Sequence, residues 1–307
     1  MNLSSNPVLI RELRGRIRGN RALLILVIYL SIIATVTLLV YAAAASSFSS
    51  GIGDPEAGRE IGKAIFITVM TVSLIQVCVI TPSLTAGSIA GERERQTYDL
   101  LMTTLLSPLQ IVLGKLSSAL AFALLLIFSS LPIAGISLLF GGVSAAELVI
   151  GIVGLVITAV CYAAVGLFWS AAMRTTLAAT VMAQGSIILL LLGIPFLFVI
   201  SSLLVGAWSD MSSALYILAM GLLLSMHPFT ALGISTAMIA SGEDALMVSI
   251  PSLQGDLLLP SPWLVYLAIS LLLTILMLLL TVRMVRPEHE ERVEQRMAAQ
   301  KRRIATK

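Results

Sequence analysis

Charged side chains are scarce in this sequence, and those that could act together lie in one short stretch. Only 11% of the 307 residues are Asp, Glu, Lys or Arg, yet Glu92, Arg93, Glu94, Arg95 and Asp99 follow one another closely. Their spacings of three and four residues would let them pair along a helix surface. Three acids beside two arginines suit recognition of a complementary protein surface better than they suit a topology signal. The stretch therefore indicates a protein contact, with a solvated loop that only fixes topology as the alternative.

The sequence offers little to enzyme chemistry. Neither Gly62-Lys63 nor Gly114-Lys115 has the upstream glycine or the following Ser or Thr of a phosphate-binding loop. Cys78 and Cys161 lie in apolar runs without neighbours that could complete a metal site. We predict that this chain is not an enzyme and holds no cofactor or metal, so that any ATP would be hydrolysed by another polypeptide.

The elements around this stretch are membrane spans. Hydrophobic residues make up 58% of the chain, too many for a soluble domain of ordinary composition. The apolar residues fall in runs of about twenty or more, the length that crosses a bilayer as a helix. We predict an all-α membrane protein with six transmembrane helices, near 22–44, 64–89, 109–140, 146–172, 177–206 and 263–283.

The basic residues predict the orientation of these spans. With both termini in the cytoplasm, all but two of the 19 Lys and Arg lie on the inner side, the exceptions being Arg59 and Lys63. This distribution satisfies the positive-inside rule. We expect a multi-pass protein of the plasma (inner) membrane, with a six-span domain over 22–286 and a charged cytoplasmic tail over 287–307.

The segment 207–262 is expected on the external side, before the last span. It contains no Lys or Arg, and its apolar part, 214–226, is short for a crossing. Runs of this length are more often re-entrant or interfacial. Glu147, near another external end, is expected to reach toward the interface.

Residues 1–21 predict a cytoplasmic amphipathic helix that lies on the membrane surface. Arg11, Arg14 and Arg18 share one face, whereas Ile10, Leu13 and Ile17 share another. Such a helix places its arginines near anionic lipid headgroups. The alternatives are a simple anchor or an additional contact with a partner subunit.

A second cytoplasmic helix is predicted over about 91–106, between the second and third spans. The charged stretch is followed by a leucine-rich run that includes Leu100 and Leu101, and Ser107-Pro108 then supplies an N-cap and a first-turn proline for the third span.

The run GERERQTYDLLMTTLLSPLQIVLGK resembles the cytoplasmic coupling region of type 2 ABC transporter permeases, and NPVLIRELRGRIRG is similar to the interfacial helix of one branch of that family. The resemblance implies a homo- or heterodimer of membrane subunits, paired with two ATP-binding subunits that hold ATP and Mg. It implies no contact with nucleic acid. The residues that match the ATPase contact are Glu92, Arg93, Glu94, Arg95, Gln96, Thr97, Asp99, Leu100 and Leu101.

The function implied by the resemblance is the permease subunit of an ATP-driven exporter. Charges are missing from the middle of the predicted spans, which disfavours a proton-coupled carrier. Apolar and hydroxyl side chains would line a pathway between two subunits and favour a lipid-like, amphiphilic or hydrophobic cargo. The alternative is a non-transporting membrane partner of an ABC ATPase in a signalling, motility or envelope-remodelling assembly.

Overall fold

The computed structural model describes residues 20–47, 55–98, 107–208, 214–252 and 255–285. Within these ranges, six helices are long and apolar enough to cross a membrane, which confirms a multi-pass membrane protein. They are α2 (Asn20–Ser47), α3 (Pro55–Glu94), α5 (Pro108–Leu139), α6 (Ala145–Ala172), α7 (Thr176–Trp208) and α10 (Pro262–Val285). The predicted surface helix, with Arg11, Arg14 and Arg18, lies outside the described residues, as does the tail over 287–307.

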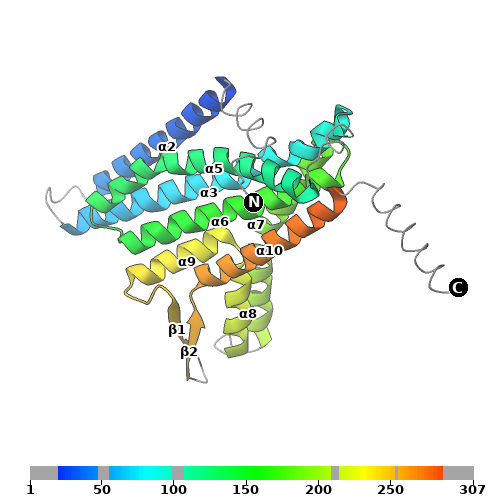
Figure 1. Cartoon of the computed structure of the whole chain (residues 1–307). Coiled ribbons are helices and arrows are strands. Elements are labelled where there is room, and N and C mark those ends of the chain that lie inside the picture. The colour runs from blue at the N-terminus through cyan, green and yellow to red at the C-terminus, as the bar shows by residue number, and fades with distance from the viewer. Residues whose placement is uncertain (1–19, 48–54, 99–106, 209–213, 253–254, 286–307) are drawn as a thin grey trace.

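Helices α3 and α6 form the centre of the bundle (Figure 1). In the most apolar 18-residue stretch of each helix, 50% of the residues are buried in α3 and 56% in α6. The corresponding share is only 11% in α2 and in α7. Helices α2 and α5 pack on one side of this central pair, and α9 and α10 on the other. The apolar outer faces of α2 and α7 are therefore the surfaces that a bilayer or a second membrane subunit would cover.

Helices α3 and α6 are in close backbone contact where Gly166 faces Pro82. A Cβ atom at Gly166 would lie 2.6 Å from the Pro82 carbonyl oxygen, so only glycine fits there. One turn further along, the buried Ser170 Oγ accepts hydrogen bonds from the backbone amides of Ile89, at 2.9 Å, and Ala90, at 3.1 Å. Small side chains allow backbones to approach in this way in membrane bundles.

Helix starts follow from local capping chemistry. Ser107 caps α5 in a capping box with Gln110, as the Ser107-Pro108 pair predicts. Ser144 and Glu147 form the corresponding box at the start of α6. Contrary to the prediction, Glu147 does not reach outward: its side chain is buried, and its Oε1 accepts from the Ser144 amide and hydroxyl. The four initial N–H groups of a helix attract such a carboxylate.

The segment before the last span contains two short helices and a β-hairpin. Helices α8 (Ala214–Ser225) and α9 (Pro228–Ala240) meet at His227 with a bend of 114°. His227 Nδ1 accepts from the Thr230 amide at the start of α9, and Nε2 donates to the Leu191 carbonyl of α7. The bent pair occupies the place of the predicted re-entrant segment, although by length and composition it could also count as a seventh crossing.

The hairpin joins β1 (Met247–Ser252) to β2 (Gly255–Pro260) in an antiparallel register that pairs Met247 with Pro260. Figure 1 shows it projecting from the bundle beside α8. These strands were not predicted from the sequence.

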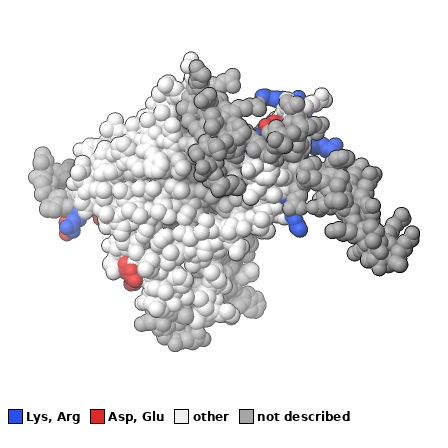
Figure 2. Space-filling model, in the orientation of Figure 1, with Lys and Arg blue, Asp and Glu red and all other residues white. Residues whose placement is uncertain are grey.

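Charged side chains gather at the two ends of the bundle, with uncharged surface between them (Figure 2). We call the end that contains the C-terminus of α3 and the first turns of α5 the Lys115 end. The opposite end, which contains the N-terminus of α3, is called the Lys63 end. At 40 residues, α3 connects the two.

Candidate partner-contact site at the Lys115 end

The first part of the predicted contact stretch continues α3 rather than starting a separate helix. Helix α3 includes Gly91 through Glu94, and the chain then turns at Arg95 and Gln96. Gln96 has a φ of 58°, a left-handed conformation that few residues other than glycine adopt. The Thr97 amide donates to the Glu92 carbonyl at 2.9 Å and closes the turn. Asp99, Leu100 and Leu101 lie outside the described residues, so a helix after this turn stays a prediction.

Glu92 binds Lys115, two turns into α5. The Lys115 ammonium lies 2.8 Å from Glu92 Oε1 and donates to the Ser88 carbonyl at 2.9 Å. The side chain of Lys115 is 1% exposed and that of Glu92 is 22% exposed. A lysine this deeply buried must be paired, because an isolated ammonium pays a large desolvation cost. The pair therefore fixes α3 against α5.

Arg93 binds the end of α6. Its guanidinium donates to the carbonyls of Ala171 and Met173, and it lies over the Tyr98 ring at 4.8 Å from the centroid. Carbonyls at a helix C-terminus have no partner within the helix and carry partial negative charge. Arg93 thus satisfies groups that the helix itself leaves unpaired.

Glu94 binds the beginning of α7. Its Oε2 accepts from the Thr176 amide at 3.1 Å and from the Thr176 hydroxyl at 2.7 Å. The carboxylate takes the place of an N-cap side chain and meets the positive end of the helix. The contact joins residues 82 positions apart in the chain.

Tyr98 adds the last span to these contacts. Its hydroxyl donates to the carbonyl of Val285, the final residue of α10, at 3.3 Å. Together, Glu92, Arg93, Glu94 and Tyr98 connect the ends of α3, α5, α6, α7 and α10. We call these four residues and Lys115 the end network.

Arg95, Gln96 and Thr97 are exposed and remain open to solvent at this end. A hollow of about 500 Å³ lies beside the turn, between the end of α3 and the start of α7. Its lining includes Glu92, Glu94, Arg95, Thr97 and Thr176, together with small residues of α3, Gly87, Ser88 and Gly91. The site therefore has an inward part that holds helices together and an outward part that can contact another molecule.

Three further residues of this site, Lys115, Tyr98 and Thr176, were not predicted from the sequence. Lys115 could have been predicted as part of a site, because an ionisable residue inside an apolar run normally has a partner. The partners of Tyr98 and Thr176 lie too far away in the sequence for any spacing rule to find them. Within the described ranges, no group of three or more His, Cys, Asp or Glu could hold a metal ion.

Comparison with protein-family models finds no match to this chain, and comparison with curated proteins finds none either.

Proposed function

We propose that the chain is the permease subunit of an ATP-driven ABC exporter, and that an ATP-binding subunit contacts the turn at Arg95–Thr97. The observation that supports this is the end network. A displacement of the turn is passed directly to α3, and through Glu92, Arg93, Glu94 and Tyr98 to α5, α6, α7 and α10. A partner that moves one exposed turn would thus move five helix ends.

The chemistry of the network suits transmission of force. The Glu92–Lys115 pair is mostly shielded from water, and charge-assisted hydrogen bonds of this kind are short and strong. The exposed Arg95 side chain has no such role and is available to a partner, whereas Thr97 closes the turn through hydrogen bonds to the Glu92 carbonyl. Two ATP-binding subunits would carry ATP and Mg, and a second permease subunit would complete the pathway.

Burial within the spans supports an apolar or amphiphilic cargo. Among the described residues, the buried Asp, Glu, Lys and Arg side chains are Lys115 and Glu147, and both lie within three turns of a helix start. Neither occupies the middle of a span, where proton relays and ion paths place their charges. We propose a lipid-like, amphiphilic or hydrophobic cargo and a cytoplasmic position for the Lys115 end.

The test is purification of the tagged chain from its native membrane in mild detergent, followed by identification of its partners and an ATPase assay. Arg95→Glu should remove the ATPase from the purified complex and leave thermal unfolding nearly unchanged, because this side chain is exposed. Arg59→Glu is the matched control, since Arg59 is an exposed arginine on the same helix at the Lys63 end. Equal recovery of an ATPase with both variants would contradict the proposed contact.

Reconstitution of the complex into vesicles separates the proposal from its alternative. ATP-dependent movement of a labelled amphiphile across the bilayer supports an exporter. ATP hydrolysis without such movement supports the non-transporting partner, for which the projecting hairpin β1–β2 offers a docking surface with an exposed Leu258.

A further inference from the structure

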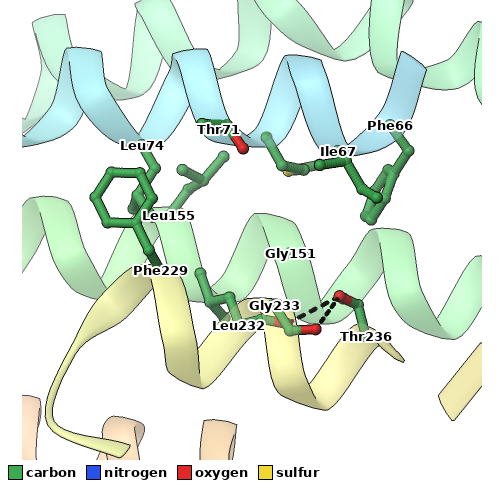
Figure 3. A pocket seen from close by; sticks show the side chains of 11 residues that line it. Phe66, Ile67, Thr71, Leu74, Gly151, Leu155, Phe229, Leu232, Gly233 and Thr236 are labelled. Carbon is green, nitrogen blue, oxygen red and sulfur yellow. Dashed lines mark hydrogen bonds between the residues drawn. The ribbon is translucent and has the colours of Figure 1, made fainter. Parts of the chain in front are cut away.

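A second hollow region lies far from the end network, between α3, α6 and α9. Its narrow inner part has a volume of about 70 Å³ and is lined on α3 by Phe66, Ile67, Met70, Thr71 and Leu74. Figure 3 shows the labelled side chains of α3 facing Gly151 and Leu155 of α6 and Phe229, Leu232 and Gly233 of α9. The lining is almost wholly apolar. The Thr236 hydroxyl is already satisfied, because it donates to the carbonyls of Leu232 and Gly233.

The inner slot widens toward the Lys63 end. A middle hollow of about 380 Å³ shares Phe66, Ile67, Gly233 and Thr236 with the slot. It shares Lys63, Glu147 and Ala240 with an outer hollow of about 970 Å³. The three follow one another along α3 and α9, and we call them the α3–α9 groove.

The outer hollow is the charged part of the groove. Two basic side chains, Arg59 and Lys63, line it together with three acids, Glu56, Glu60 and Glu147. Lys63 is half-buried and lines both the outer and the middle hollow, so its ammonium lies near the boundary between charged and apolar lining. Among the described residues, neither Arg59 nor Lys63 forms an ion pair.

We propose that the α3–α9 groove binds an amphiphile, with a single apolar chain that passes through the middle hollow into the slot and a zwitterionic headgroup in the outer hollow. An anionic group such as a phosphate would meet Lys63 and Arg59, and a cationic group beyond it would meet Glu60. Ligand sites commonly combine an apolar lining with a few polar groups that fix orientation. Neither a purely anionic nor a purely cationic headgroup matches both signs of charge.

The walls of the slot can accommodate a chain. Across from Gly151, the slot is closed by the flexible end of Met70, whose Sδ would lie 3.1 Å from a Cβ at that position. Methionine adapts to irregular apolar surfaces at small cost. On the opposite wall, a Cβ at Gly233 would meet no atom within 4 Å. The inference requires only this chain, and it does not rest on the proposed partnership with an ATPase.

The experiment is photolabelling of the purified full chain in dodecyl maltoside with a lysophosphatidylcholine that carries a diazirine in its acyl chain. Saturable labelling is expected in the peptides that contain residues 66–74 and 229–236. Dodecylphosphocholine should compete, whereas dodecyl phosphate and dodecyltrimethylammonium, which share its chain length, should compete roughly tenfold more weakly.

Gly233→Leu should reduce saturable labelling at least roughly fivefold, because the new side chain enters the groove without clashing with the folded protein. Gly135→Leu on α5 is the matched control, since a Cβ there also meets no atom within 4 Å and the residue does not line the groove. Lys63→Gln should weaken competition by dodecylphosphocholine but not by dodecyltrimethylammonium. Labelling that never saturates, that spreads evenly over the outer faces of α2 and α7, or that persists in Gly233→Leu would overturn the proposal.

Discussion

The two ends of the bundle use the same residue types in opposite ways. At the Lys115 end, Glu92, Arg93 and Glu94 each bind a different helix, so charge holds the structure together. At the Lys63 end, Arg59 and Lys63 line an open hollow. There the α5–α6 connection lies in close backbone contact with α3 at Gly142. Charged side chains that bind one another or a helix end stabilise the fold, whereas charged side chains that line a hollow can bind a ligand.

The largest effect is expected from breaking the buried ion pair. Glu92→Leu leaves the Lys115 ammonium buried without its carboxylate, and we expect a loss of about 3 kcal/mol in the free energy of unfolding. The double variant Glu92→Leu with Lys115→Met should recover most of this loss, because no buried charge remains. Thermal unfolding in detergent measures both.

Lys63→Met is the matched control for that prediction, and it should change the unfolding free energy by less than about 0.5 kcal/mol. A loss as large as that of Glu92→Leu would show that charge also holds the Lys63 end together.

The next effect tests the packing at the Lys63 end. A Cβ atom at Gly142 would lie 2.8 Å from the Lys63 amide nitrogen, so Gly142→Ala must force the α5–α6 connection away from α3. We expect a destabilisation of about 2 kcal/mol, measured by the same unfolding assay. Gly87→Ala at the Lys115 end should be neutral or slightly stabilising, because its Cβ would be 4.0 Å from the nearest side-chain atom. Similar losses in both variants would contradict the contrast between the two ends.

The smallest effect compares the two capping boxes. Ser107→Ala should cost about 0.5 kcal/mol and Ser144→Ala about 1.5 kcal/mol, within the usual range for N-caps. The difference is expected because Glu147, which accepts from Ser144, is 5% exposed, whereas the Ser107 cap faces solvent. Equal losses would show that burial of Glu147 adds nothing to its cap. Hydrogen exchange in the first turn of each helix locates the change.

The spans, the Ser107-Pro108 helix start and the short apolar run 214–226 could be predicted because each depends on neighbours in the sequence. Hydropathy over twenty residues reports the environment of a helix, and a capping serine acts within its own first turn. The hairpin at 247–260 was missed because short strands outside a large sheet have weak patterns.

The end network could not be predicted in the same way. Its contacts join residues 23 positions apart for Lys115 and Glu92, 82 for Thr176 and Glu94, and 187 for Tyr98 and Val285. Spacing along a single helix suggested instead that Glu92 would pair with Arg95. Glu92 pairs with Lys115 instead, because the buried ammonium of Lys115 has no access to water and needs the Glu92 carboxylate.

The length of α3 gives its close contact with α6 a mechanical meaning. At 1.5 Å per residue, the helix is about 60 Å long, and Pro82 lies nearer the Lys115 end, opposite Gly166. If α3 tilts as a rigid rod about this contact, its arms measure about 40 Å to its N-terminus, beside the outer hollow, and about 18 Å to Glu94. A small displacement at the short arm would then be roughly doubled at the outer hollow, in the opposite direction.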